Sequence, residues 1–400
     1  GGTVTGDVTS VNYGNAEGKT ATVTITGGAI TGELDTRSYD PKTNELTNID
    51  DAAKATIEVT GGTFNNDPTK YVAENSASTK NSDGTFGVAK TYLAKVGETS
   101  YYTMDEAFHA AVASGETLYL LRDYTTGAEQ NSGSKSFAID LDGHTWTYTG
   151  TNTNCAAFQI NYSDVTLTVK NGTVVSNSMV GLIPSAMGGT IKYDNAGLVF
   201  EDVTMTANGH SGIETNGNNT SDSITLKNST LNVPNGFGIY FPSSGKLTIE
   251  NSTINAKTMG VQVCAGSLEI TGDKTAINVT GDPVPKTEND GAIQDGAAIS
   301  VVDRTGYKGL DKVEAKNGKA LKAYAFSNTN KTEEEFDNAD KKLTVTGGAF
   351  SNDVKDYVAA NFTTANITTS GETTYYVGKE TVEAAAAKAP SGSTVTVTQG

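Results

Sequence analysis

Apolar and polar residues alternate in short segments that recur along the middle of the chain. The segments begin at Leu167, Leu198, Ile224, Leu247 and Leu268, and successive starts lie 31, 26, 23 and 21 residues apart. In each segment the first and third residues are apolar, and a polar turn follows. This alternation predicts a strand that buries one face. Its recurrence without helical segments predicts the stacked rungs of a parallel β-helix, a solenoid whose core is continuous from rung to rung.

The polar turn of each rung has its own pattern. An Asn or Asp, suited to the left-handed backbone of a sharp corner, recurs at one place in four successive rungs: Asn171, Asp202, Asn228 and Asn251. The preceding residues alternate in charge: Lys170, Glu201, Lys227 and Glu250. In a stack, each charge would lie between two opposite charges, which favours a single register. Sequons such as those at Asn228 and Asn251 coincide with these turns, so turn formation explains them better than glycosylation.

A second strand follows in every rung, and its outward side chains are candidates for binding. The expected inward residues are Phe158, Leu182, Ile213, Ile239, Val261 and Ile299. The candidate ligand-binding stripe on the outer face is Gln159, Glu214, Tyr240 and Gln262, with Phe241 nearby. Exposed aromatic rings stack on sugar rings, and amides pair with hydroxyls. The alternative is an ordinary polar outer face with one tyrosine.

A longer repeat divides the chain. The word GETSYY at 97–102 returns as GETTYY at 371–376, and VTGGTFNNDPTKYVAEN at 59–75 returns as VTGGAFSNDVKDYVAAN at 345–361. These repeats predict the C-terminal part of one module at 1–96, a complete module at 97–370 and the start of a third at 371–400. The chain is therefore expected to come from a longer tandem array. Residues 1–96 either continue a β-helix or form a separate small sheet.

Each module is expected to open with a helix. Residues 104–113 have an apolar face made of Met104, Phe108, Ala111 and Val112, and Thr103 and Glu106 have the spacing of a capping box. The end of a solenoid exposes apolar surface that must be covered. We therefore expect this helix to cap the first rung.

Composition and charge exclude several classes of partner. The chain has 400 residues, 36% of them hydrophobic, and a net charge of −17 with three Arg. Nucleic acid is not expected, because phosphate binding needs clustered basic side chains, and acidic polysaccharide is disfavoured. No apolar stretch predicts membrane insertion in this fragment. Cys155 and Cys264 read as small buried residues, although a disulfide between them is open.

These rungs, the Ala-rich helix before SGETLYLLRDYT, the FAIDLDGHTWTYTG segment and the closing VTGGAFSNDV resemble right-handed β-helix surface proteins of anaerobic gut bacteria, usually described as adhesin-like. The resemblance covers most of the chain, and its motifs specify the fold more than the function. It implies an all-β, right-handed parallel β-helix. It also implies an extracellular location, attached to the cell surface or wall through an anchor outside this fragment. A monomer that binds glycan or a host surface or matrix component is expected.

The fold is shared with pectate lyases and polygalacturonases, so catalysis needs its own evidence. The candidates are the carboxylate pair Asp140 and Asp142, and His210 with Glu214. The pair reads better as a turn, and the partner motifs of polygalacturonases are not found beside His210. The acidic loop with Asp282, Glu288, Asp290 and Asp295 reads as solvated rather than as a calcium site. Neither a cofactor nor a metal is expected.

The sequence therefore predicts a non-catalytic, adhesin-like surface module. A structural stalk without a ligand and a carbohydrate-active enzyme, either a polysaccharide lyase or a glycosidase, are the alternatives. The irregular segments 281–297 and 303–342 are further places where a partner could bind, because long loops on a rigid scaffold often carry function.

Overall fold

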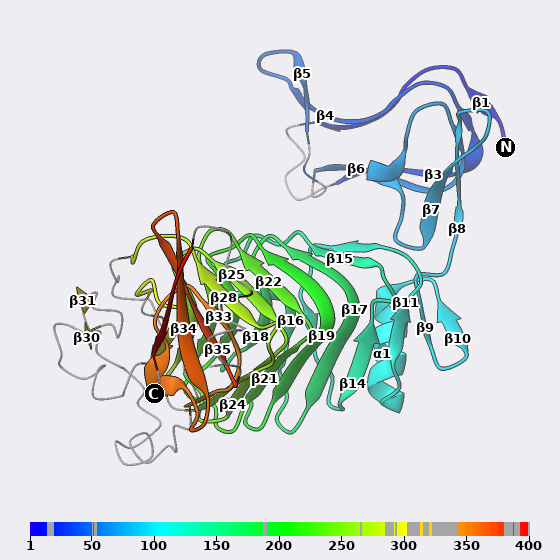
Figure 1. Cartoon of the computed structure of the whole chain (residues 1–400). Coiled ribbons are helices and arrows are strands. Elements are labelled where there is room, and N and C mark those ends of the chain that lie inside the picture. The colour runs from blue at the N-terminus through cyan, green and yellow to red at the C-terminus, as the bar shows by residue number, and fades with distance from the viewer. Residues whose placement is uncertain are drawn as a thin grey trace. The chain divides into compact units, whose positions relative to one another are not determined.

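The computed structural model describes residues 1–13, 20–49, 51, 54–186, 190–264, 266–284, 292, 294–301, 313–314, 320–321, 343–379, 387 and 393–398. The chain forms two compact units, Gly1–Ala110 and Ala111–Gly400 (Figure 1). Both consist mainly of β-strands. The α-helix α1 (Met104–Ser114) crosses the boundary between them.

Most strands of the second unit belong to three parallel ladders. The first ladder runs in the order β11 (Leu118–Leu120), β14 (Phe137–Asp140), β17 (Thr166–Ser176), β19 (Gly197–Ala207), β21 (Ser223–Lys227), β24 (Lys246–Glu250), β27 (Ser267–Thr271) and β32 (Leu343–Val345). The second ladder shares β17 and β19, and its other strands are β12 (Tyr124–Thr126), β15 (Thr145–Tyr148), β22 (Thr230–Val233), β25 (Thr253–Ala256), β28 (Ala276–Val279) and β33 (Gly348–Phe350).

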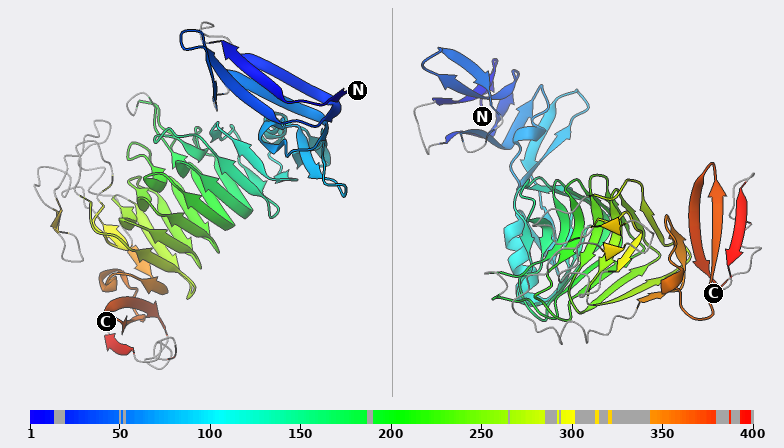
Figure 2. Two further views of the ribbon diagram at one scale, coloured as in Figure 1. Left: turned by 90° about the horizontal axis from the view of Figure 1, so that it is seen from above. Right: turned by 90° about the vertical axis from the view of Figure 1, so that its left-hand side faces the viewer.

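The third ladder is a separate seven-stranded sheet. Its order is β13 (Gln130–Asn131), β16 (Ala156–Gln159), β18 (Met179–Ile183), β20 (Ser211–Thr215), β23 (Phe237–Phe241), β26 (Met259–Val263) and β29 (Ile299–Val301). The chain visits the ladders in turn, so β21, β22 and β23 are followed by β24, β25 and β26, each paired with its predecessor in the same ladder. Figure 2 shows these strands lying side by side in successive layers. This arrangement is compatible with an all-β solenoid.

The predicted rung register is confirmed in the first ladder. Leu167, Leu198, Ile224, Leu247 and Leu268 pair in sequence from strand to strand, and all five are buried. The turn prediction is confirmed as well. Asn171, Asp202, Asn228 and Asn251 have φ values of 59°, 56°, 49° and 46°, which lie in the left-handed region that Asn and Asp tolerate best.

The alternating charges also lie in one column. Lys170, Glu201, Lys227 and Glu250 pair in register along β17, β19, β21 and β24. The ammonium of Lys227 lies 2.6 Å from Oε1 of Glu201. Exposed ion pairs contribute only about 0–1 kcal/mol each, so this column favours one register more than it adds stability.

The inward assignment of Leu182 is wrong. Gly181 pairs with Phe158 and Ile213, and Leu182 pairs with Gln159 and Glu214. The β18 strand is therefore offset by one residue from the predicted alignment, and Leu182 takes the column that we expected to be polar. A one-residue offset exchanges the two faces of a strand. A Cβ at Gly181 would lie 2.5 Å from Cδ2 of the buried Leu198, which explains why glycine occupies the inward position.

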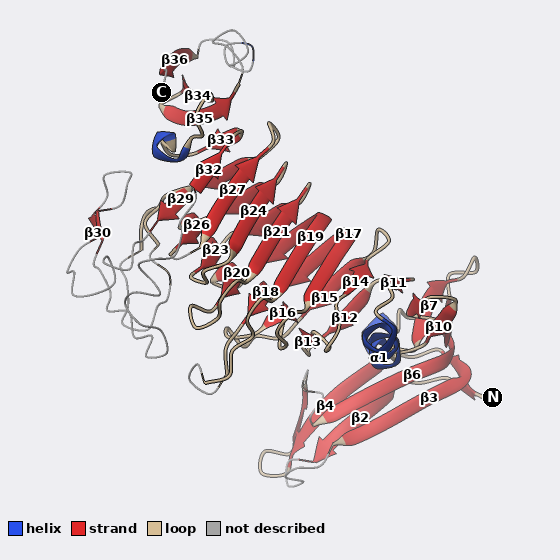
Figure 3. Ribbon diagram, turned by 90° about the horizontal axis from the view of Figure 1, so that it is seen from below, coloured by secondary structure: helices blue, strands red, loops and turns tan. Residues whose placement is uncertain are grey.

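The first unit contains shorter sheets. β1 (Thr3–Val4), β3 (Ala21–Ile30) and β6 (Ala55–Phe64) are parallel, and β7 (Ser76–Lys80) and β8 (Phe86–Lys90) complete their five-stranded sheet. A second sheet contains β2 (Val8–Tyr13), β4 (Leu34–Asp40) and β5 (Glu45–Asn48). β9 (Ala94–Val96) and β10 (Thr99–Tyr101) form a hairpin. Figure 3 marks the strands of both units in red.

The repeat between 59–75 and 345–361 is also a repeat of structure. Each copy has a 3-10 helix at the same place, η1 (Thr69–Tyr71) and η3 (Lys355–Tyr357). Each also has a parallel bridge between equivalent valines, Val59 with Val72 and Val345 with Val358. The two copies are 286 residues apart in sequence and have the same local fold.

Both GET words lie at hairpin turns. Gly97 has φ 55° between β9 and β10, and Gly371 has φ 88° between β34 (Thr363–Thr369) and β35 (Glu372–Gly378). β36 (Thr394–Thr398) pairs antiparallel with β34. The interval between the GET words is 274 residues, twelve fewer than the 286 of the other repeat. The β7–β8 hairpin pairs with β6 as β34–β35 pairs with β33, and the first junction contains β9–β10 as a further hairpin. The second Ala-rich segment falls mostly outside the described residues.

The predicted helix is confirmed, with a change to its buried face. α1 starts at Met104 and ends at Ser114, and Met104, Ala107 and Ala111 are buried, whereas Phe108 is only half-buried. Its first turn is held by two groups. The Glu106 amide donates to Oγ1 of Thr103 at 3.4 Å, and the Met104 amide donates to Oε1 of Glu74 at 2.6 Å. In the last turn, which belongs to the second unit, the Ala113 carbonyl accepts a hydrogen bond from Lys135.

The two irregular segments are described only in part. Residues 285–291 and 302–342 are largely outside the described residues, except for a short antiparallel pair, β30 (Val313–Glu314) and β31 (Ala320–Leu321).

Candidate binding surfaces

The predicted outward stripe lies in one column of the third ladder, but most of it is buried. Gln159, Glu214, Tyr240 and Gln262 occupy equivalent positions, with Leu182 between the first two. Relative exposure is 6% for Gln159, 8% for Tyr240 and zero for Gln262, and Nε2 of Gln262 donates to Oγ of Ser300 at 2.9 Å. Phe241 is also buried. The expected open aromatic platform is therefore not found.

Glu214 is the member of that column that remains partly exposed. Its Oε1 lies 3.4 Å from Nε2 of His210, whose ring packs edge-on against Phe237 at a centroid distance of 5.9 Å. The structure thus brings together the two residues that the sequence paired as a catalytic candidate. Glycoside cleavage needs a second carboxylate in addition to Glu214.

Asp140 and Asp142 have structural roles. Asp140 is buried, its two oxygens accept from Nδ2 of Asn171 at 3.1 Å, and Oδ1 also accepts from the Asp142 amide at 3.0 Å. Asp142 has φ 47°, so it forms the corner that the sequence predicted. With its lone pairs used in this way, Asp140 stabilises the turn and connects two rungs.

The other candidate chemistry is partly outside the described residues. Glu288 and Asp290 of the acidic loop lie there, and Asp295 is buried. Across the described ranges, no cluster of three His, Cys, Asp or Glu side chains could hold a metal ion. Cys155 and Cys264 are free thiols, so the disulfide that the sequence left open is not formed. Burial is the largest cause of the raised pKa of Cys155.

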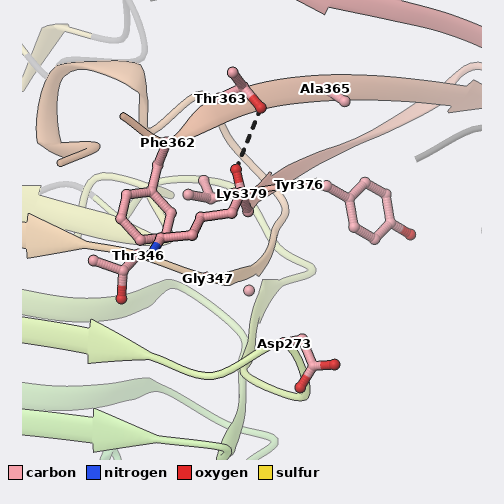
Figure 4. A pocket seen from close by; sticks show the side chains of 11 residues that line it. Asp273, Thr346, Gly347, Phe362, Thr363, Ala365, Tyr376 and Lys379 are labelled. Atoms are coloured by element: carbon pink, nitrogen blue, oxygen red, sulfur yellow. Dashed lines mark hydrogen bonds between the residues drawn. The ribbon is translucent and has the colours of Figure 1, made fainter. Parts of the chain in front are cut away.

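A pocket of about 330 Å³, which the sequence did not suggest, lies at the end of the second unit (Figure 4). Its lining includes Phe362, which precedes β34, Tyr376 of β35 and Lys379, which follows β35. Gly347 and Gly348 form another part of the wall. Thr363 donates from Oγ1 to the Gly378 carbonyl at 3.3 Å, which closes the hairpin at this point. The Lys379 ammonium lies 5.3 Å from the centre of the Phe362 ring.

The chemistry of this pocket is that of a small mixed cavity. The Lys379 ammonium makes a cation–π contact with the Phe362 ring. Asp273 is the carboxylate in the lining. Phe362 and Tyr376 differ from the residues at matching register positions in the first copy, Ser76 and Gly87. Phe362 is therefore particular to the second junction, whereas Tyr376 is also the second tyrosine of the repeated GETTYY motif.

The outward side of the second ladder presents mostly hydroxyl and amide side chains. Its inward residues, such as Trp146, Leu231 and Ile254, are buried, so the residues between them point outward. One outward column holds Thr145, Thr173, Thr204, Thr230, Thr253 and Ala276, and the next holds Thr147, Val175, Thr206, Asn232, Asn255 and Asn278. We refer to these twelve residues as the Thr/Asn face. None is buried and none is ionisable.

Three side chains of the Thr/Asn face form a hydrogen-bonded ladder. Nδ2 of Asn255 donates to Oδ1 of Asn232 at 2.9 Å, and Nδ2 of Asn278 donates to Oδ1 of Asn255 at 2.9 Å. Each amide has two N–H donors and two acceptor lone pairs, so each retains hydrogen-bonding capacity directed away from the ladder. The sequence contains a signal for this face: a Thr at the seventh position of the rungs starting at Leu167, Leu198, Ile224 and Leu247.

Comparison of the chain with protein-family models, with curated proteins and with solved structures found no match. Within the described part of the chain, no helix has the length and hydrophobicity needed to cross a lipid bilayer.

Proposed function

We propose that this chain is a segment of an extracellular, adhesin-like bacterial surface protein built from tandem right-handed parallel β-helix modules. In this proposal the modules bind glycan or a host surface or matrix component without catalysis. The observation that carries it is the repeated module end, since residues 59–75 and 345–361 have the same 3-10 helix and the same valine bridge. Repetition of a whole structural boundary is expected in an array and not in a single-domain enzyme.

The helix α1 has the role of a cap in this proposal. It follows the first module end, and its last turn contacts the start of the stack through Val112 and Lys135. Ala111 is fully buried there. A solenoid module needs such a cover at its first rung, because the exposed edge and core of an open stack favour aggregation.

A stalk without a ligand is the second candidate, and one observation favours it. The aromatic residues expected to bind a sugar, Tyr240 and Phe241, are buried. A module that only spaces other domains away from the cell needs a rigid stack and a polar surface, and the three ladders provide both.

Binding measurements on the purified 400-residue chain separate these candidates. Immobilised neutral glycans, acidic glycans and extracellular-matrix proteins would be screened by surface plasmon resonance. The proposal predicts saturable binding to at least one of these classes, and boiled protein serves as the control for unfolded chain. Absence of saturable binding across all three classes would contradict the adhesive function and leave the stalk.

A further inference from the structure

We propose that the Thr/Asn face is the binding surface and that its ligand is a neutral polysaccharide chain laid along the stack. This inference rests on the proposed adhesive function and assigns to it a surface and a class of ligand. The argument uses three properties of the face: its lack of charge, its repeat and its fixed amide groups.

The lack of charge selects the class of ligand. The chain carries a net charge of −17, yet the twelve residues of the Thr/Asn face include no ionisable side chain. An anionic polymer would be repelled by the whole molecule and would find no cation on the face. A neutral polymer with many hydroxyl groups meets Thr hydroxyls and Asn amides, which both donate and accept hydrogen bonds.

The repeat sets the size of the ligand. Five threonines, from Thr145 to Thr253, succeed one another in five adjacent strands. Parallel strands are about 4.8 Å apart, so this column is about 19 Å long. That length exceeds a single sugar ring and fits an extended oligosaccharide or polysaccharide. Each rung offers the same hydroxyl, so successive units of a polymer can make successive equivalent contacts.

The amide ladder reduces the entropic cost of binding. The bonds between Asn232, Asn255 and Asn278 fix the orientation of the side chains before any ligand arrives. Free side chains lose about 0.5–1.5 kcal/mol of entropy each when a ligand immobilises them. Fixed amides avoid most of that loss, which matters for a surface that makes many weak hydrogen bonds.

The test removes hydroxyls from this face and compares a matched pair of changes on the neighbouring ladder. In the test variant, Thr230→Val and Thr253→Val remove two adjacent hydroxyls from the Thr/Asn face. In the control variant, Thr225→Val and Thr248→Val remove two adjacent outward hydroxyls from the first ladder in the same two rungs. Valine keeps the branched shape that suits a strand, so both variants should fold.

The probes are soluble mannan and a soluble β-glucan as neutral polysaccharides, with polygalacturonate as the acidic counterpart. We expect the wild-type chain to bind a neutral polymer in preference to polygalacturonate. The test variant should bind it about tenfold more weakly, because two hydrogen bonds of about 0.5–1.5 kcal/mol each are lost. The control variant should bind as the wild type does, and thermal unfolding should be the same for all three chains.

Three outcomes would overturn the inference. Equal binding by the test and control variants would place the site elsewhere while leaving the adhesive function intact. Preference for polygalacturonate, or for matrix protein alone, would reject the class of ligand. A wild-type chain that sediments as a dimer while the test variant sediments as a monomer would assign the face to a second copy of this chain. Failure of the adhesive function itself is recognised separately, because then no glycan or matrix protein binds the wild type.

Discussion

At the scale of single residues, the turns of the stack contain one buried carboxyl group with unusual surroundings. Asp222 is fully buried, and the Ala196 amide donates to its Oδ1 at the long distance of 3.4 Å. Desolvation raises the pKa of Asp222 to about 7, against hydrogen bonds from Asn219, Ala196 and Ser243 that lower it, and the nearby Asp194 raises it further. The folded chain therefore holds a proton on Asp222 at mildly acidic pH.

Asp222→Asn tests this buried group through the pH dependence of stability. The folded-state pKa of Asp222 lies above the unfolded value of about 3.9, so this group stabilises the folded wild type fully below about pH 4. That contribution to the free energy of unfolding is lost as the pH rises through about 7. The variant lacks this loss. Its free energy of unfolding relative to wild type should rise between pH 5 and pH 8 by on the order of 2 kcal/mol.

The fluorescence of Trp146, the single tryptophan of the chain and fully buried in the second unit, reports this unfolding. A stability difference between variant and wild type that stays constant from pH 5 to pH 8 would show that Asp222 does not titrate in this range. Ser221→Ala, at an exposed neighbouring position, controls for disturbance of the turn.

At the scale of elements, sequence patterns predicted the strands whose two faces differ most. The first ladder follows the alternation of Leu167 and Val169 because solvent lies on one side of it. In β18 the residues Val180, Leu182 and Ile183 are all apolar and all buried, so alternation cannot choose between two registers. The burial of Tyr240 was not predictable either, because a strand pattern does not encode what covers the outer side of a sheet.

The sequence contains the pattern of the Thr/Asn face, but strand alternation alone does not mark it as a binding surface. Thr173, Thr204 and Thr230 each precede an apolar residue that points inward. The apolar residues define the strand, and the pattern gives no reason to single out the threonines beside them. The pocket lined by Phe362 and Tyr376 could not be found in this way. The Ser370–Gly371 turn indicates the β34–β35 hairpin, but the pocket also needs Asp273 and Gly347, which lie far from it in sequence.

The glycines of the third ladder give a prediction about close stacking. A Cβ on Gly238 would lie 2.3 Å from the carbonyl oxygen of Gly260 in the next strand. That oxygen belongs to the backbone and can move only with its rung. Gly238→Ala should lower the free energy of unfolding by about 2 kcal/mol or more, as measured by urea denaturation.

Gly127→Ala is the matched control, because its new Cβ would lie 3.6 Å from its nearest neighbour, Oγ1 of Thr149. Gly127 is also exposed. Equal stabilities of these two variants would mean that the third ladder is not stacked as closely as described.

The start of α1 gives a second prediction at this scale. The Met104 amide donates to Glu74, a charged acceptor at the positive end of the helix. Glu74→Ala should remove about 1 kcal/mol from the stability of the first turn and speed amide exchange at Met104 several-fold, as followed by hydrogen–deuterium exchange. Glu116→Ala, at an exposed site beyond the other end of the helix, should leave that exchange unchanged. Equal exchange in the two variants would exclude Glu74 as the cap.

At the scale of the whole molecule, the chain combines high negative charge with the uncharged Thr/Asn face. A net charge of −17 favours the solubility of a polar, strand-rich chain. The alternating charges in the first ladder favour one register but contribute little stability. If the Thr/Asn face is the binding surface, the molecular charge should affect which ligands approach but not how tightly a neutral ligand is held.

The salt dependence of polysaccharide binding tests this account most directly. The affinity of the 400-residue chain for the neutral polymer that it binds best would be measured between 20 mM and 500 mM NaCl. Because the proposed contacts are hydrogen bonds between uncharged groups, the account predicts an affinity that changes by less than about twofold over this range. A steep fall in affinity with salt, or no binding to any neutral polymer, would contradict a neutral glycan-binding face.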